Sequence, residues 1–240
     1  MKRVAALMTL VFLYHYSYAS SGHMPGPNPS ENVEKSPQEI IDGYAAAVGG
    51  VDKINAVKNM VIVMEALIQG MTLEISSTSD QENKRLVQQT AMNGNVMQKT
   101  IVKDGKGYMS MMGQIQELQE DQLDAVNAQI YVFPEIYYER LGYTLSAEGE
   151  GEVDGEKAYI LKIVTNSGLE TKEFYSVTSG LKLRTSSEMA GDISYGDYRE
   201  VDGLKIPHKM TISNAMLPVP IEANLVLAKF NDQLDNSLFE

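Results

Sequence analysis

The chain has 240 residues, 43% of them hydrophobic, and a formal net charge of −12. This size and apolar content suffice for one large core or two small ones, and we expect one domain because all-β folds often reach this length intact. The absence of cysteine excludes disulfides, thiolate nucleophiles, cysteine-based metal sites and a lipid anchor on an N-terminal cysteine. The acidic balance argues against nucleic acid and anionic membrane surfaces as partners.

The first residues have the pattern of a secretory signal peptide. Two basic residues precede Val4–Leu13, an apolar run that is too short to span a membrane, and Ser17 and Ala19 are small residues at the cleavage-defining positions. We therefore expect a signal peptide over residues 1–19. The alternative is a membrane-tethering segment. No other long apolar run occurs, so no transmembrane anchor is expected in the mature protein.

A leader should separate this segment from the folded domain. Residues 20–35 are rich in Ser, Pro, Gly and Asn and lack apolar periodicity, which predicts a flexible leader. The domain is expected over residues 36–240 and should begin with a helix. Ser36 can cap that helix, Pro37 suits its first turn, and Glu39 completes a capping box.

After this helix the pattern changes to strands separated by turns. Asn93–Gly94, Asp104–Gly105 and Asp154–Gly155 favour hairpins, whose central residues need positive φ. About ten or eleven strands joined in sequence should form an antiparallel meander, which curls when it is this long. Two helical interruptions are expected, within residues 116–130 and 133–143, where the chain should cross the sheet.

The strand after Asp104–Gly105 is apolar on both faces. Met109 and Met111 alternate there with Tyr108 and Met112, whereas a half-buried strand is usually apolar on one face only. Two interpretations stay open. The methionines fill an ordinary core, to which their adaptable side chains are suited, or they line an apolar pocket that takes a ligand.

Residues that could carry catalysis are sparse. His208 is the one histidine outside the N-terminal leader region, and its place on an apolar strand face favours a packing role. The acidic run 148–156 surrounds a predicted turn and should be solvated. Asp192, Asp197 and Asp202 lack the spacing of a calcium loop. We expect no enzymatic activity, no cofactor and no metal site.

The order of these segments resembles the outer-membrane lipoprotein-sorting family, the LolA/LolB-like proteins of double-membrane bacteria. The capped helix, IVKDGKGYMSMMG at 101–113, FPEIYYERLGY at 133–143 and the strands that follow carry the resemblance, which covers residues 36–240. The segment DGLKIPHKMTI at 202–212 is especially similar to members that accompany, or are fused to, insulinase-type zinc peptidases.

The resemblance implies a half-open antiparallel β-barrel with an N-terminal helix and a helical lid over its concave face. In the family's carriers, this cavity holds lipoprotein acyl chains in transit across the periplasm. It implies a soluble, monomeric periplasmic carrier for the acyl chains of lipoproteins or for another lipid. The alternative is a non-enzymatic accessory or regulatory subunit of an envelope protein complex, such as a peptidase, with the cavity filled.

Thirteen residues are expected to line the cavity that the resemblance implies. They are Met60, Ile62, Met64, Met97, Met109, Met112, Leu123, Val126, Ile130, Ile136, Tyr137, Leu183 and Met210. Two positions depart from the family pattern. Tyr108 stands where carriers usually have tryptophan, and Arg85 is the nearest match to a functional arginine of an early strand. The acceptor-type member is lipid-anchored, which a chain without cysteine cannot be.

Overall fold

The structure, a computed structural model, describes residues 35–188, 191–215 and 217–240. The expected signal peptide, and the leader up to residue 34, lie outside the described residues. Thirteen strands occur in the described part, and all belong to one antiparallel sheet. Their bounds are β1 (Asn59–Ile68), β2 (Met71–Asp80), β3 (Arg85–Met92), β4 (Asn95–Lys103), β5 (Lys106–Met111), β6 (Gln114–Glu117), β7 (Thr144–Val153), β8 (Glu156–Val164), β9 (Glu170–Ser176), β10 (Lys182–Ser187), β11 (Gly191–Val201), β12 (Leu204–Ser213) and β13 (Ile221–Phe230).

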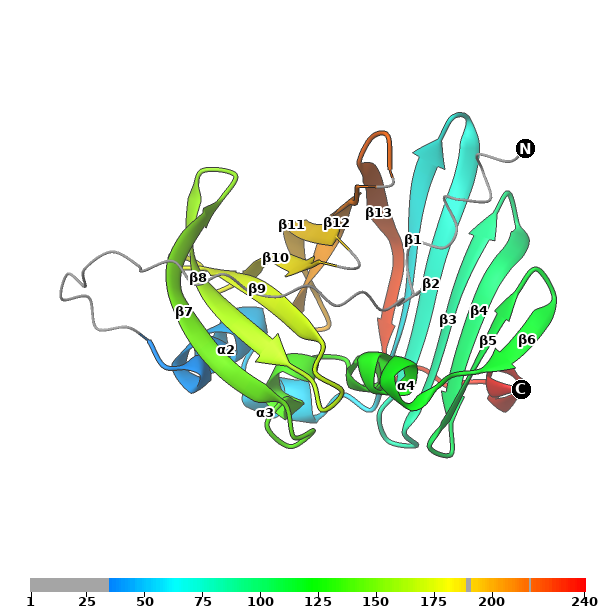
Figure 1. The fold of residues 1–240 in the computed structure, drawn as a ribbon, viewed down its shortest axis with the longest axis horizontal. Helices are drawn as coiled ribbons and strands as arrows, with labels where there is room; N and C mark the ends of the chain where they lie inside the picture. Colours follow the sequence, from blue (N-terminus) through cyan, green and yellow to red (C-terminus); the bar gives the residue numbers. More distant parts are fainter. Residues whose placement is uncertain (1–34, 189–190, 216) are drawn as a thin grey trace.

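The sheet consists of two meanders, which are joined where β1 pairs with β13, the first and last strands in the sequence. Its order is β6-β5-β4-β3-β2-β1-β13-β12-β11-β10-β9-β8-β7, so β1 and β13 pair at the centre while β6 and β7 form the edges. The sheet curves strongly but does not close on itself (Figure 1). The expectation of a mainly β, half-open barrel is confirmed.

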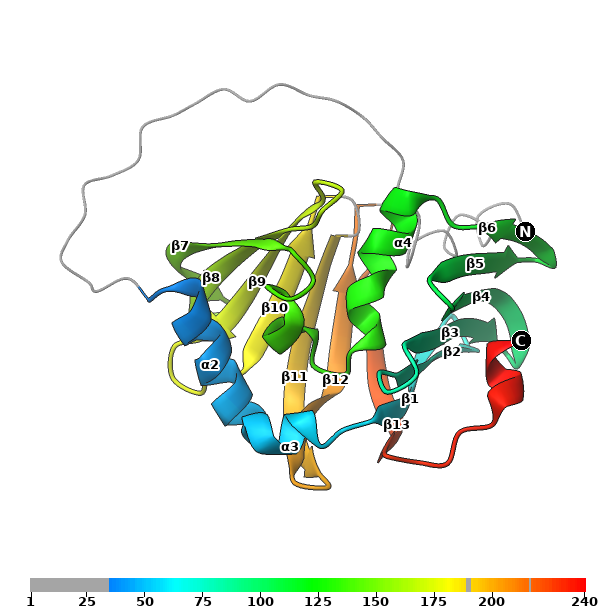
Figure 2. The same ribbon diagram turned by 90° about the horizontal axis from the view of Figure 1, so that it is seen from below.

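Short helices lie on the concave side of this sheet. They are α2 (Pro37–Val48), α3 (Val51–Asn55), α4 (Glu120–Asn127) and two 3-10 turns, η2 (Ala128–Ile130) and η3 (Pro134–Tyr137). The capping box of α2 is present, because the Ser36 hydroxyl accepts from the Glu39 N–H and the Glu39 carboxylate accepts from the Ser36 N–H. Figure 2 shows α4 between the two halves of the sheet.

The sheet has more strands than the ten or eleven expected. One of the additional strands is β6, which lies partly where a helical interruption was expected to begin. All four of its residues are exposed, and Ile115 pairs with Ser110 of β5. A short edge strand of this kind has no buried face and so leaves no periodic pattern in the sequence. The helix itself starts later, at Glu120.

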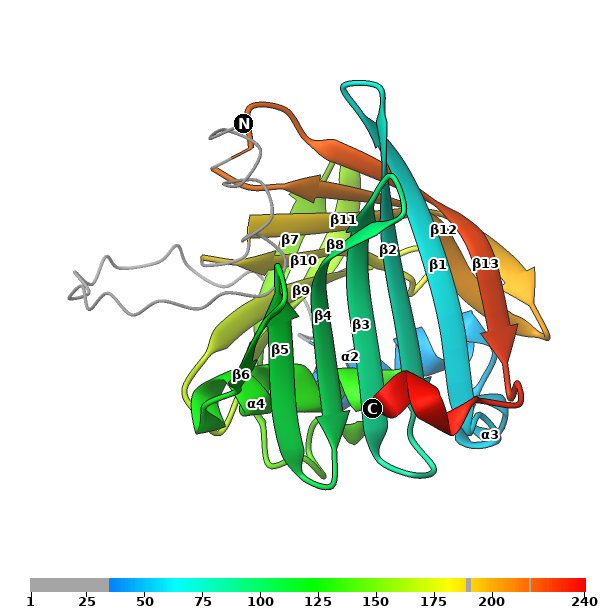
Figure 3. The same ribbon diagram turned by 90° about the vertical axis from the view of Figure 1, so that its right-hand side faces the viewer.

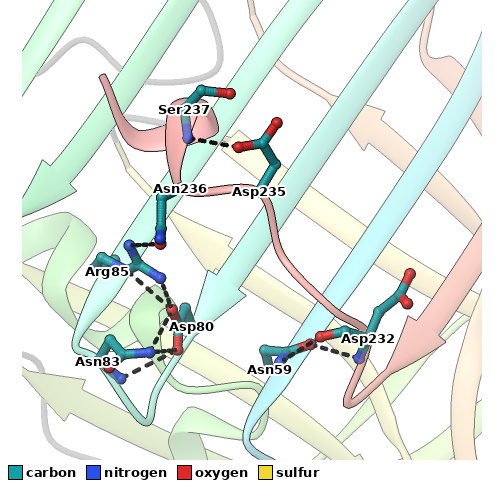
Figure 4. Close-up of polar contacts among 8 residues, drawn as sticks. All are labelled: Asn59, Asp80, Asn83, Arg85, Asp232, Asp235, Asn236 and Ser237. Atoms are coloured by element: carbon teal, nitrogen blue, oxygen red, sulfur yellow. Dashed lines mark hydrogen bonds and ion pairs between the residues drawn. The ribbon is translucent and has the colours of Figure 1, made fainter.

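The C-terminal segment crosses the outer face of the sheet. It ends in η4 (Asn236–Phe239), which lies over β3 and β4 (Figure 3). Asn59 and Asp232 exchange two hydrogen bonds at its start, and Arg85 donates to the Asn236 side-chain oxygen at 2.9 Å (Figure 4). The Phe239 side chain is only 2% exposed, so this segment is part of the packed structure.

Phe239→Ala should lower the free energy of unfolding by about 3–5 kcal/mol, because it removes a buried ring from the outer face and leaves a cavity. The neighbouring Leu238 is exposed and serves as a matched control. Leu238→Ala should change stability by less than about 0.5 kcal/mol in the same urea titration. Equal effects of both substitutions would show that the segment does not pack as described.

Candidate functional site

Strand register assigns the residues of β1 to β5 that line the concave face. Leu86 and Met109 pack against Val126 and Ile130 of the crossing helices, so both point to the concave side. Alternation then places their neighbours in rows that run across the strands. From the end near α4 upward, these rows are Met60, Ser79, Leu86, Val102; then Ile62, Ser77, Gln88, Thr100, Met109; then Met64, Ile75, Thr90, Gln98, Met111; then Ala66, Leu73, Met92.

The lower end of this face is covered by helix. The helix-covered cluster consists of Leu86, Val102, Met109, Leu118, Val126 and Ile130, with Met111, Leu123 and Tyr131 packed against it. Its core side chains are buried. The inner face of the doubly apolar strand β5 is therefore packed against α4 and η2 here, and this part of the concave face is ordinary core.

The upper end is different, because strands alone build it. The methionine cluster consists of Met64, Ala66, Leu73, Met92 and Ala223, bordered by Ile68, Met71, Ile75, Met97, Met210, Ile221 and Leu225. The bordering side chains are half-buried. Methionine is flexible and polarisable, so a surface made of it can adapt to ligands of irregular shape.

Uncharged polar residues separate these two clusters. The polar belt, made of Ser77, Gln88, Thr90, Gln98 and Thr100, lies on β2, β3 and β4. Gln88 donates to the side-chain oxygen of Gln129 in η2, and Ser79, one row lower, donates to the Gln129 backbone oxygen. The belt therefore begins where the helices end.

A buried charged cluster links the crossing segment, which is made of α4, η2 and η3, to strands β9 and β10 in the second half of the sheet. Lys182 of β10 forms ion pairs with Glu135 of η3 and, at 2.5 Å, with Glu173 of β9. The hydroxyls of Tyr138 and Tyr175 donate to the Glu173 carboxylate. The cluster has two carboxyl groups and one ammonium, so Lys182 balances the charge of only one of them when both are ionised.

Aromatic rings surround the Lys182 ammonium. Its nitrogen lies 5.7 Å from the ring centres of Tyr44 and Tyr175 and 6.0 Å from that of Tyr195. Burial lowers the pKa of Lys182, but the charges of Glu135 and Glu173 outweigh it and hold that pKa well above its ordinary value. Burial raises the pKa of Glu135, against the opposing charge of Lys182. Lys182 is therefore a fixed cation at the centre of the charged cluster.

Comparisons with solved structures show which fold this is. A DUF1329 family protein from Desulfovibrio piger superposes with a TM-score of 0.56 at 14% identity, over 85% of this chain and 96% of that one. A LolA superfamily protein from Nitrosomonas europaea gives 0.53 at 13%, over 86% and 98%. A domain described as an outer-membrane lipoprotein-sorting protein, from Vibrio parahaemolyticus, gives 0.53 at 12%, over 84% and 94%. The chain has the LolA-like fold. No protein-family model matches the sequence, and a search of curated proteins finds no match.

Within this LolA-like fold the residues expected to line the cavity fall into separate groups. Met64 belongs to the methionine cluster, Met97 and Met210 border it, and Met60 and Ile62 are half-buried on the same face. Four others lie in or against the helix-covered cluster. These are Met109, Leu123, Val126 and Ile130.

The remaining expected residues lie elsewhere. Ile136 packs on the core beneath α2, Tyr137 stacks on Tyr131 with ring centres 4.3 Å apart, and Leu183 is half-buried at a β-bulge. Met112 is 61% exposed and does not lie on the concave face. It forms the β5–β6 turn with Gly113, and both residues have positive φ, as a two-residue hairpin turn requires.

Arg85 does not point to the concave face either. Its guanidinium forms an ion pair with Asp80 at 2.5 Å (Figure 4). It also lies 4.1 Å from the centre of the Phe239 ring, on the outer side. In this chain Arg85 therefore holds the C-terminal segment. The nearest sequence match to the family's arginine has a structural role that its position in the sequence does not reveal.

Sequence reasoning missed the charged cluster and the polar belt. Alternation does place Glu173 and Tyr175 of β9 on one face, and this was an available signal. Lys182 is harder to find, because a bulge between Lys182 and Arg184 breaks the alternation of β10. Simple alternation would place Lys182 and Arg184 on one face, whereas the bulge puts the buried Lys182 on the face of Tyr175 and Arg184 on that of Phe174.

The structure adds little that resembles a reaction centre. The Nδ1 atom of His208 lies 3.2 Å from the backbone oxygen of Ile206, a local structural contact. Among the described residues, no group of three or more His, Cys, Asp or Glu side chains is placed to hold a metal ion. In the same part of the chain, no helix is long and apolar enough to cross a membrane.

Lys182→Met should destabilise the protein by about 3–5 kcal/mol, because it leaves two buried carboxylates without a cation. Glu135→Gln should cost less than about 1 kcal/mol, because it leaves a neutral Lys182–Glu173 pair in the charged cluster. Urea unfolding at neutral pH measures both. A larger loss in Glu135→Gln than in Lys182→Met would contradict the charge balance described.

Glu135→Gln should also change how stability depends on pH. Because the pKa of Glu135 is raised above its ordinary value of 4.5, the folded state binds that proton more tightly than the unfolded chain. This contribution to stability is complete below pH 4.5 and is lost as pH rises through the folded-state pKa. The unfolding free energy of the variant minus that of wild type should therefore increase from pH 4.5 to about pH 7. A flat or falling difference would refute the assignment.

Proposed function

We infer that the protein is a soluble periplasmic carrier that holds acyl chains of a lipoprotein, or of another lipid, against the methionine cluster. The observation that carries this proposal is the methionine cluster at the upper end of the concave face, which strands alone build and whose bordering side chains are half-buried. A contiguous apolar surface of this kind is a common mark of a ligand-binding face. The LolA-like fold supports the proposal only at the level of architecture.

The energetics suit a carrier. Transfer of an acyl chain from water contributes about 0.8 kcal/mol per CH₂, so a chain of about sixteen carbons offers roughly 10 kcal/mol as an upper bound. Association entropy reduces this value substantially. An adaptable methionine surface that buries part of the acyl chain would bind a lipid firmly enough to keep it from water, and weakly enough to release it.

A second surface favours the alternative, a non-enzymatic accessory subunit of an envelope complex. The edge strand β6 exposes Ile115, its hairpin turn exposes Met112, and the neighbouring strand β5 exposes Tyr108. Among the described residues, no strand pairs with the outer side of β6. The opposite edge is protected by charge, because β7 carries Glu148, Glu150 and Glu152. Strand addition at β6 would suit a protein partner. The comparisons give no support to a link with insulinase-type peptidases.

Ile75→Glu tests the carrier proposal. Ile75 pairs with Met64 on the concave face and is half-buried, so a carboxylate there would place charge against the methionine cluster. The full chain should bind a fluorophore-labelled diacylglycerol saturably, and Ile75→Glu should weaken that affinity at least about tenfold.

Leu67→Glu is the matched control. Leu67 is 76% exposed on the outer face of β1, and its replacement makes the same change in net charge. It should leave the affinity unchanged. The carrier proposal fails if wild type shows no saturable binding, or if the two variants weaken binding equally.

A further inference from the structure

Three polar side-chain atoms in the polar belt are buried and have no hydrogen-bond partner among the described residues. They are Gln88 Oε1, Gln98 Nε2 and Thr100 Oγ1. Gln98 is 4% and Thr100 1% exposed. Unpaired buried polar groups destabilise a fold and are uncommon, so three in one place need a reason.

These three atoms belong to adjacent side chains. Gln88 of β3 is the register partner of Thr100 in β4, and Gln98 lies two residues before Thr100 on the same face. Together they offer a donor from the Gln98 amide, an acceptor from the Gln88 amide, and a hydroxyl that can do either. A group with one carbonyl and one donor would satisfy all three.

The surroundings exclude a charged group. The two rows that contain these atoms hold Ile62, Ser77 and Met109, and Met64, Ile75, Thr90 and Met111, none of which is charged. A carboxylate or phosphate placed here would lose its hydration without gaining a cation. The matching chemistry is therefore polar but neutral.

The polar belt is also placed correctly for a lipid. The methionine cluster adjoins it at Met64 and Ile75, in the row of Thr90 and Gln98, and continues one row above at Leu73 and Met92. Met111, the half-buried register partner of Gln98, lies directly beside the belt. Because a methionine side chain is flexible, its movement would open the belt to a ligand that enters from the methionine cluster.

Building on the proposed carrier function, we propose that the polar belt binds the neutral linkage of an acylated ligand, with the acyl chain on the methionine cluster. The linkage is a carbonyl with a neighbouring donor, as in an amide or in an ester beside a free hydroxyl. Gln98 and Thr100 donate to the carbonyl, and Gln88 accepts from the N–H or hydroxyl. Free fatty-acid anions and plain hydrocarbons should therefore bind with lower affinity.

Competition binding on the full chain tests this proposal. A fluorescent alkyl probe is displaced with four ligands of equal chain length, namely a monoacylglycerol, a primary fatty amide, a fatty-acid anion and a hydrocarbon. At least one of the two neutral carbonyl ligands should bind about tenfold tighter than the anion and the hydrocarbon, as expected for newly satisfied hydrogen bonds. Which of them does so identifies the linkage as an ester or an amide.

Thr100→Val and Gln98→Met separate this role from a structural one. Each nearly preserves shape while it removes an unpaired polar group, so the melting temperature should stay the same or rise. Affinity for the preferred carbonyl ligand should fall about tenfold, and hydrocarbon affinity should not change. Thr72→Val, at an exposed position of β2, is the matched control and should leave every affinity unaltered.

Two results would overturn the inference while the carrier function stands. One is equal affinity for all four ligands in wild type. The other is an equal fall in affinity for carbonyl and hydrocarbon ligands in Thr100→Val. A different result would overturn the carrier function itself. If none of the four ligands, the hydrocarbon included, displaces the probe, the methionine cluster binds no acyl chain.

Discussion

The structure depends on one constraint, which is that a single curved sheet has one concave face and too little helix to cover it. Two short α-helices and the segment of α4, η2 and η3 supply almost all of the cover. They pack against the lower end of the strands and leave the upper end to strand side chains alone. The division of the concave face into a packed part and an adaptable part follows from this shortage.

The crossing segment is held by two kinds of contact that differ in purpose. At α4 and η2, apolar packing on Met109 and Leu86 supplies stability. At η3, the Glu135–Lys182 contact fixes the position of the segment on the sheet. A buried charge has few acceptable partners, whereas an apolar side chain has many. The charged cluster would thus fix where the segment crosses the sheet, although it adds little net stability.

Much of the fold could be predicted from the sequence, and the parts that could not share a cause. The capped α2, the meander and the helical crossing follow from local patterns such as Ser36–Glu39 and the Asp–Gly turns. The charged cluster does not, because its members come from η3, β9 and β10, and a bulge interrupts the alternation of β10 at Lys182. Arg85 shows the same limit, since its partner Phe239 lies at the far end of the chain.

The order of surfaces along the strands also explains why polar groups tolerate burial here. If Gln88, Gln98 and Thr100 were apolar, the methionine cluster and the helix-covered cluster would form one continuous apolar face. The helix α4 could then shift along that face. Polar side chains interrupt that face, so they mark where helix packing stops. An unpaired hydrogen-bonding group costs stability in the free protein, and it is retained where a bound group compensates it. Helix placement alone would need polar side chains but not unpaired ones, and this difference distinguishes a boundary from a binding site.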